Sequence, residues 1–201
     1  MNKRFRRALL VLGTALLVAA LAATAAFAVD STSFKMVRSQ SAVDNDCLKH
    51  ARADVDIRTF GSNQTMDVKL KHAAKNTGFT LFVIQRPNSP FGVSWYQGDL
   101  DTDKHGNGEV RVKGIFSEET FVFAPDRVKA PRVDHQDARK NPKFAPVHTL
   151  HLGLWFADPK EARAAGCSNT VTPFDGDHEA GIQALSTRTF GNLHGPLRRI
   201  K

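Results

Sequence analysis

The segment 174–179 carries the side chains of this sequence that are best suited to hold a metal ion. It places His178 among three acidic residues, Asp175, Asp177 and Glu179, and carboxylate oxygens together with an imidazole nitrogen bind divalent cations. We expect Asp175, Asp177 and His178 to be the candidate metal ligands. The alternative is a charged turn held together by local hydrogen bonds.

The segment 99–110 is similar to the first half of a calcium-binding loop, because Asp99, Asp101 and Asp103 occupy alternate positions. Such a loop needs glycine at its sixth position and glutamate at its twelfth, where this sequence has Lys104 and Val110. The pattern therefore favours a solvated hairpin turn, with a calcium site as the alternative.

The histidines and nucleophiles do not form a known catalytic pattern. His148 and His151 are three residues apart in an expected strand, so their side chains point to opposite faces and are not expected to share a metal. The sequence has no H-E-x-x-H zinc motif, no G-x-S-x-G nucleophile turn and no phosphate-binding glycine loop. These observations favour a protein without catalytic activity.

Aromatic rings in the segment 91–97 offer stacking as a second kind of chemistry. Side chains alternate in the expected strand 93–100, so Trp95 points with Val93 while Tyr96 points to the other face. We expect Trp95 to pack inside, and Tyr96 and Phe91 to form an outer surface that stacks on a sugar or a peptide. Ordinary packing beneath a neighbouring loop is the alternative.

The segment 125–146 is proline-rich, has no periodicity and carries a local charge of +3. Loops of this length inside compact domains are uncommon and are either functional or disordered. The pattern favours a plain surface insertion. The alternative is a loop that binds an anionic partner through Arg127, Lys129 and Arg132.

The N-terminus has the three parts of a secretory signal peptide: a basic segment 1–7, an apolar run 8–26 and the small-residue site Ala26-Phe27-Ala28. We expect cleavage after Ala28, with a retained membrane anchor as the alternative. Cleavage removes four basic residues and no acidic one, so the formal charge of +8 for 201 residues falls to +4 for the remaining 173. That charge is ordinary for a soluble domain and does not favour a nucleic-acid partner.

Cys47 and Cys167 are the only cysteines, and both follow the signal peptide. In an exported chain they are expected to form one disulfide, and two free buried thiols are the alternative. The bridge would close a loop of about 120 residues, which is worth roughly 4–5 kcal/mol in the chain-entropy model.

Hydrophobic residues recur with a period of two over 53–59 and 66–70, which indicates half-buried antiparallel strands. Further strands are expected near 79–84, 93–100, 110–116, 121–123, 150–156 and 181–186, and one short helix from Asp158 to Gly166. The sequence therefore predicts an all-β fold, an antiparallel β-sandwich (Ig-like or jelly-roll-like) with one short helix. A partly closed β-barrel is the alternative. The expected domain spans 47–190, between a flexible lead-in at 29–46, in which 34–37 could form one short strand, and a C-terminal tail at 191–201.

Three stretches carry a resemblance to a group of exported bacterial proteins of unknown function. They are 79–98 (FTLFVIQRPNSPFGVSWYQG), 151–167 (HLGLWFADPKEARAAGC) and 171–185 (VTPFDGDHEAGIQAL). The similarity covers residues 50–190 and implies a secreted all-β domain. It implies no active-site residues.

We therefore expect a secreted, non-catalytic β-domain that binds an extracellular or cell-envelope ligand, either a glycan or a protein. Nucleic acid is not an expected partner, no membrane span is expected after signal cleavage, and no cofactor is expected apart from a divalent cation at Asp175, Asp177 and His178. The alternative is a metal-binding extracellular protein of the hydrolase type.

Overall fold

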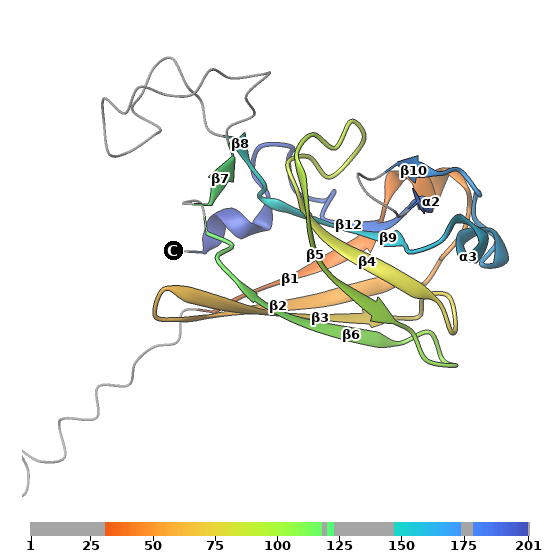
Figure 1. The fold of residues 1–201 in the computed structure, drawn as a ribbon, viewed down its shortest axis with the longest axis horizontal. Helices are drawn as coiled ribbons and strands as arrows, with labels where there is room; N and C mark the ends of the chain where they lie inside the picture. The colour runs from red at the N-terminus through yellow and green to blue at the C-terminus, as the bar shows by residue number, and fades with distance from the viewer. Residues whose placement is uncertain (1–30, 118–119, 123–146, 174–178, 201) are drawn as a thin grey trace, which may run out of the picture.

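Eight antiparallel strands form one curved sheet in the computed structural model, which describes residues 31–117, 120–122, 147–173 and 179–200. Across the sheet the strands follow the order β5, β4, β9, β12, β1, β2, β3, β6. Their bounds are β1 Ser31–Arg38, β2 Arg52–Phe60, β3 Asn63–Lys71, β4 Gly78–Ile84, β5 Ser94–Asp101, β6 Gly108–Gly114, β9 His151–Phe156 and β12 Gln183–Ser186. Figure 1 shows the sheet curling until its two end strands, β5 and β6, lie side by side.

Side chains, rather than a hydrogen-bonded ladder, fill the seam between β5 and β6. These strands are the two ends of the sheet and have no ladder with each other. A Cβ atom on Gly98 of β5 would lie 3.4 Å from methyl groups of both Val110 and Val112 on β6, so the strands pack closely at this level. The all-β prediction is confirmed, and the nearly closed sheet corresponds to the barrel alternative.

The interior of the barrel is filled by alternate residues of the strands, as the period of two requires. β1 is in the middle of the sheet, because it pairs with β2 on one side and with β12 on the other. The buried inward-facing side chains include Phe34, Met36, Val55, Ile57, Met66, Val68, Leu70, Phe79, Leu81, Leu152, Leu154 and Phe156.

A second, smaller apolar cluster lies on the outer face of β4 and β9. Phe82, Ile84 and Trp155 are buried there, and the ring of Phe91 packs on Trp155 with the ring centroids 4.9 Å apart. Trp155 alternates with the inward-facing Leu154 and Phe156, so it belongs to the opposite face. A loop and an aromatic cluster therefore cover this part of the barrel wall.

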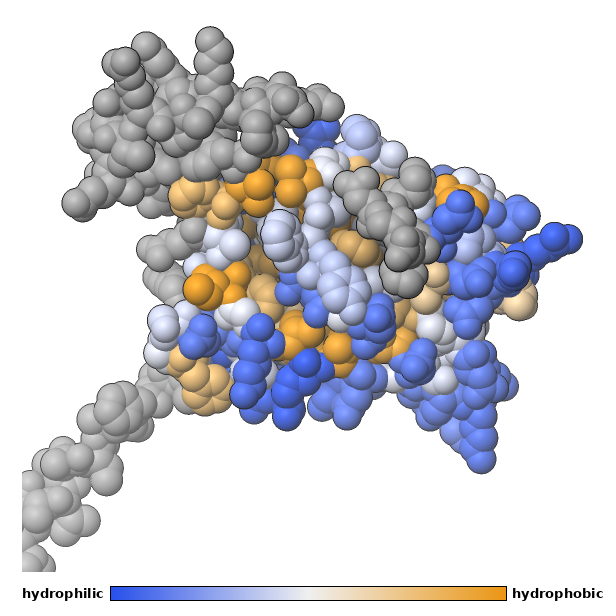
Figure 2. Space-filling view, viewed as in Figure 1, coloured by the Kyte–Doolittle hydropathy of each residue, from blue (hydrophilic) through white to orange (hydrophobic). Residues whose placement is uncertain are grey.

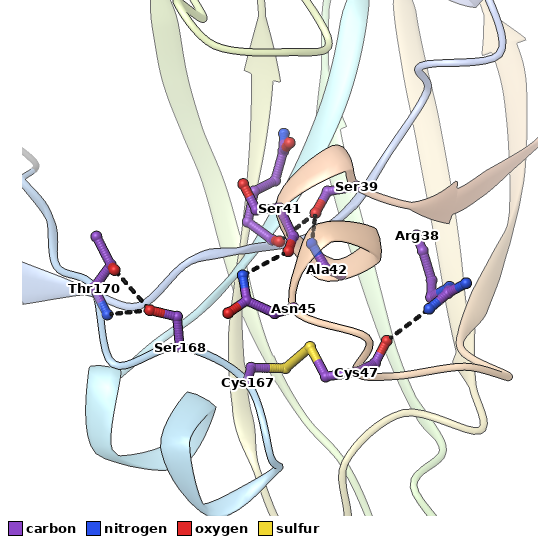
Figure 3. Close-up of a disulfide and its surroundings, with 10 residues drawn as sticks. Arg38, Ser39, Ser41, Ala42, Asn45, Cys47, Cys167, Ser168 and Thr170 are labelled. Carbon is purple, nitrogen blue, oxygen red and sulfur yellow. Dashed lines mark hydrogen bonds between the residues drawn. A yellow bond between two sulfur atoms is a disulfide. The ribbon is translucent and has the colours of Figure 1, made fainter.

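Two short helices bring the cysteines together. Ser39 caps α2 (Gln40–Asp44), and Asp158 caps α3 (Pro159–Ala164) at the position that the sequence predicts. Each helix is followed by a cysteine whose N–H donates to a carbonyl of that helix, Cys47 to Ala42 and Cys167 to Ala162. The sulfur atoms are 2.03 Å apart (Figure 3), so the predicted pairing is confirmed.

The remaining described elements are small. They are β7 (Phe121–Val122) paired with β8 (Val147–His148), β10 (Thr172–Pro173) paired with β11 (Glu179–Ala180), and the 3-10 helix η2 (Pro196–Arg199). None of the helices in the described ranges combines the length and the hydropathy that crossing a bilayer requires.

Both ends of the domain are more ordered than the sequence analysis predicts. Residues 31–38, expected in a flexible lead-in, form β1, whose Met36 is fully buried. Residues 196–200, expected in a tail, place Leu197 and Ile200 in the core. Polar residues outnumber apolar ones in 31–38, where Phe34 and Met36 are the buried side chains, whereas in 196–200 the exposed Arg198 and Arg199 lie between buried apolar residues.

Candidate functional site

A pocket of about 400 Å³ opens where the strands β5 and β6 diverge, at the start of β5 and the end of β6. We call it the seam pocket. Its lining residues are Val83, Trp95, Tyr96, Gln97, Lys113, Gly114, Ile115, Phe116, Ser117, Thr120, Phe121, Val122, Thr149 and Leu197. The volume falls within the range of roughly 300–1,000 Å³ that is usual for small-molecule sites.

The rim of the seam pocket concentrates exposed apolar surface. Trp95, Tyr96, Ile115 and Phe121 are 62%, 52%, 52% and 39% exposed, and they are four of the seven large hydrophobic residues exposed in the described ranges. Figure 2 shows apolar surface among the hydrophilic side chains in the area of β5 and β6. Clustered exposed apolar side chains beside a cavity are typical of a ligand-binding or docking site.

The register of β5 explains how Trp95 comes to line the pocket. Trp95 pairs with Val83, which faces the interior, and Tyr96 pairs with Phe82, which faces outward. Gln97 is the extra residue of a bulge, because Gly98 pairs with Leu81 directly before Phe82. Trp95 is thus on the inner side of β5, but the open seam leaves it exposed, so the prediction that it packs inside is wrong.

Tyr96 is exposed, and its side chain is fixed by two neighbours. Its ring packs edge-on against Phe82 with the centroids 6.0 Å apart, and its hydroxyl donates to Asp99 over 2.9 Å. This hydrogen bond, together with partial burial and the negative charge of Asp99, raises the pKa of the Tyr96 hydroxyl. The phenol therefore stays neutral at physiological pH and presents a fixed apolar face with a polar edge.

The floor of the seam pocket is apolar and rigidly supported. Phe116 is buried, and its N–H donates over 2.8 Å to the side-chain oxygen of Gln64, which is itself buried on β3. Val83 and Leu197 complete the floor. The absence of a side chain on Gly114 leaves room for the Phe116 ring, which would lie 3.0 Å from a Cβ atom there.

Polar groups lie beside these apolar side chains, and Ser117 and Thr149 are buried as well. Ser117, Thr120 and Thr149 line the pocket with hydroxyl groups, and Lys113 lines it from the end of β6. Lys113 is exposed and forms no ion pair within the part of the chain that the structure describes. The pocket thus combines an apolar body, several hydroxyls and one available cation.

The sequence analysis places Phe91 with Tyr96 on one stacking surface, but Phe91 does not line the seam pocket. Its ring covers Trp155 on the outer face, and the backbone hydrogen bond from Arg86 N–H to the Phe91 carbonyl fixes the loop that carries it. Phe91 is half-buried. The rings of Trp155 and Phe82 lie between Phe91 and Tyr96 in a chain of edge-on contacts.

The other predicted candidates are placed as follows. Arg127, Lys129 and Arg132, and the predicted metal ligands Asp175, Asp177 and His178, lie outside the described residues and remain predictions. Within the described ranges, no three His, Cys, Asp or Glu side chains are grouped so that they could hold a metal ion. Asp99, Asp101 and Asp103 therefore do not converge on one point.

The carboxylate of Asp103 closes the turn between β5 and β6. One of its oxygens accepts hydrogen bonds from the N–H groups of His105 and Asn107, at 2.8 and 2.9 Å. These backbone hydrogen bonds, led by that of Asn107, lower the pKa of Asp103. This is the solvated hairpin turn that the sequence pattern favours.

The two histidines of the 148–151 segment have separate surroundings, as predicted. His151 is fully buried; its Nε2 donates to the Asn192 carbonyl at 3.2 Å, and its Nδ1 is 3.0 Å from the Thr187 hydroxyl. Burial lowers the pKa of His151, which fits a neutral ring that pins the C-terminal segment to β9. His148 packs against Phe121 with the ring centroids 6.1 Å apart.

The sequence analysis missed Ile115, Phe121 and Lys113 as pocket residues. The available signal was that Ile115 and Phe116 are adjacent apolar residues at the end of an alternating strand, so one of them must leave the core face.

No protein-family model matches the chain, and no curated protein matches it either.

Proposed function

We propose that this chain is an exported, non-catalytic binding protein whose ligand occupies the seam pocket. The observation that supports it is the gathering of Trp95, Tyr96, Ile115 and Phe121 around one cavity while most other large apolar side chains of the described residues are buried. Export is supported by the signal-peptide pattern at 1–28 and by the Cys47–Cys167 pair, because such bridges persist in oxidising compartments.

The lining favours a small amphipathic ligand over a glycan or a protein. The buried lining side chains Val83, Phe116 and Leu197 are apolar, and only Ser117 and Thr149 bring hydroxyl groups to the buried part of the lining. A sugar there would find few hydrogen-bond partners for its own hydroxyls. An apolar chain or ring would instead fill the apolar floor, and its polar or anionic end would meet Lys113 and the hydroxyls. The source of such a molecule would be the cell envelope or the medium.

Iodide quenching of tryptophan fluorescence tests this proposal on the exported protein. The chain has two tryptophans, and Trp95 is 62% exposed whereas Trp155 is 1% exposed, so iodide reaches mainly Trp95. Decanoate, an amphiphile with a single chain, should shield Trp95 in a saturable way. Saturable shielding by a short glycan but not by decanoate would show that the pocket binds ligand and that the amphipathic class is wrong.

A matched pair of variants then localises the binding. Ile115→Ser should weaken decanoate binding about tenfold, because it removes most of an exposed aliphatic side chain that the bound ligand would cover. Phe60→Ser is the control, since Phe60 is 55% exposed and does not line the pocket. Equal affinity of both variants, or no shielding of Trp95 by either ligand, would overturn the proposal.

A further inference from the structure

A second concavity, of about 410 Å³, lies at the other end of the β5–β6 pair. Three short segments form its walls: residues 48–50 after α2, residues 72–75 on the crossing from β3 to β4, and Ala164 and Ala165 at the end of α3. Thr77 completes the lining. We call it the crossover pocket, and its chemistry differs from that of the seam pocket.

The lining of the crossover pocket carries basic side chains and no carboxylate. Lys49, His50, His72 and Lys75 contribute to it. Lys49 pairs with Asp46 at 2.8 Å, whereas the side chains of His50, His72 and Lys75 have no hydrogen-bond or ion-pair partner among the described residues. Three basic side chains are thus available at one concave surface.

Two acidic side chains beside the pocket are oriented by main-chain donors and do not line it. The Glu161 carboxylate on α3 accepts from the Gly78 N–H at 3.2 Å, and Asp103 accepts from two N–H groups of its own turn. The N–H groups of Ala74 and Lys75, in the segment that lines the pocket, donate to no acceptor in the described part of the chain and are available as main-chain donors. Side-chain cations and free N–H groups together form the kind of concavity that binds anions.

The walls of the crossover pocket are held in place before any ligand binds. The Cys47–Cys167 bridge ties the segment starting at Leu48 to the helix end at Ala165. The third wall is fixed to the β5–β6 turn, because Ala73 N–H donates to the Gly106 carbonyl and Asn76 N–H donates to the Asp103 carbonyl. Such preorganisation lowers the entropic cost of binding.

We infer that the crossover pocket binds the anionic group of a small phosphate or sulfate ester. Lys75 would act as a point charge on the anion, with His50 and His72 as flanking donors. The volume exceeds that of the anion alone, so an organic body would occupy the alanine-lined part of the wall. This site is separate from the seam pocket and does not depend on the function proposed for it.

NMR titration of the exported protein tests this inference. Inorganic phosphate, sulfate, glucose 6-phosphate and uncharged glucose are added at constant ionic strength, because surface charges respond to salt in general. The amide signals of His50 and of residues 72–75 should shift saturably with phosphate, sulfate or the ester, and glucose should leave them unchanged. The relative affinities for phosphate and sulfate then assign the preferred anion.

Two lysine variants separate a site from general surface charge. Lys75→Gln should weaken binding of the anion roughly five- to tenfold, whereas Lys104→Gln, an exposed lysine that does not line the pocket, should leave it unchanged. Binding should also be unaffected by Ile115→Ser, which alters the seam pocket only. The inference is overturned if no saturable shift occurs, if chloride reproduces the shifts, or if both lysine variants bind equally.

Discussion

Gly153 on β9 leaves the space that the Trp155 ring occupies. A Cβ atom at Gly153 would lie 2.2 Å from a ring carbon of Trp155 and 2.7 Å from the Gln183 amide nitrogen. Trp155 is 1% exposed and packs between Phe82 and Phe91, with centroid distances of 5.5 and 4.9 Å. Any side chain at Gly153 must therefore displace the centre of the outer aromatic cluster.

We predict that Gly153→Ala lowers the free energy of unfolding by about 1–3 kcal/mol, the usual cost of overpacking. Urea denaturation measures the effect. Gly191→Ala is the control, because a Cβ atom there meets nothing closer than 3.8 Å and the change should stay within about 0.5 kcal/mol. Equal stability of both variants would show that the cluster rearranges without cost.

Asp67 on β3 makes stability depend on pH. Its carboxylate accepts hydrogen bonds from Arg111 and Arg58 of the neighbouring strands, and these bonds outweigh its burial and lower its pKa below the ordinary 3.8. Because the pKa in the folded state is the lower one, the stabilisation is complete above pH 4 and is lost as the pH falls through the folded-state pKa.

We therefore expect Asp67→Asn to be less stable than the natural protein at pH 7, by about 1 kcal/mol or less since both arginines are substantially exposed. The difference should shrink as the pH falls below the ordinary carboxylate pKa of 3.8 and vanish once the pH is below the lower folded-state pKa. Denaturation midpoints across this pH range provide the test. A difference that stays constant down to pH 2 would mean that packing, and not ionisation, is responsible.

At the level of elements, the disulfide is the strongest single link between distant parts of the chain. It joins the end of α2 to the end of α3 across a sequence separation of 120 residues (Figure 3). In the chain-entropy model a bridge of this span stabilises the fold by roughly 4–5 kcal/mol, a large share of the 5–15 kcal/mol that domains usually have.

The double variant Cys47→Ser, Cys167→Ser should consequently lose roughly 4–5 kcal/mol of unfolding free energy. Urea unfolding of this variant, of the oxidised protein and of the reduced protein gives the comparison. The reduced protein should behave like the double variant. A midpoint shared by all three samples would show that the bridge does not constrain the unfolded chain.

Most strands with a period-two pattern and the capped helix α3 were predictable, and several short elements, among them α2 and η2, were not. The strands at 53–59 and 66–70 appear as β2 and β3, and the helix start at Asp158 was identified from its capping side chain. β1 was underestimated because only Phe34 and Met36 mark its buried face among polar residues. Its stability comes from pairing with β2 and β12, which are distant in sequence.

The seam pocket was only partly predictable, for a related reason. Alternation correctly separates Trp95 from Tyr96, but the exposure of Trp95 depends on the missing ladder between β5 and β6. A strand that hydrogen-bonds to a neighbour on both sides and a strand at the edge of a sheet have the same alternation of apolar and polar residues, so no local sequence pattern distinguishes them. The outward direction of Tyr96 was predicted correctly, because strand alternation alone determines to which face its side chain points.

For the whole molecule, the choice between sandwich and barrel depends on β1. The register places Phe34 opposite Val55 of β2 and Val37 opposite Ser186 of β12, so this one strand connects two groups of strands into a continuous sheet. A sandwich and a barrel bury the same alternating faces, so the sequence pattern supports both. β1 and β12 pair at only two positions, and β5 and β6, the end strands of the described sheet, have no ladder with each other.

Export should be visible in the mature chain itself. If residues 1–28 form a cleaved signal peptide, the exported protein begins at Val29, carries a formal charge of +4 and contains no free thiol. Amino-terminal sequencing, intact mass and thiol titration of the exported protein measure these three properties together.

The same chain made in a reducing cytoplasm without residues 1–28 should contain two free thiols and should unfold at a lower urea concentration. An exported protein that keeps residues 1–28 and fractionates with membranes would instead support the retained anchor, and would confine the seam pocket to ligands at the membrane surface.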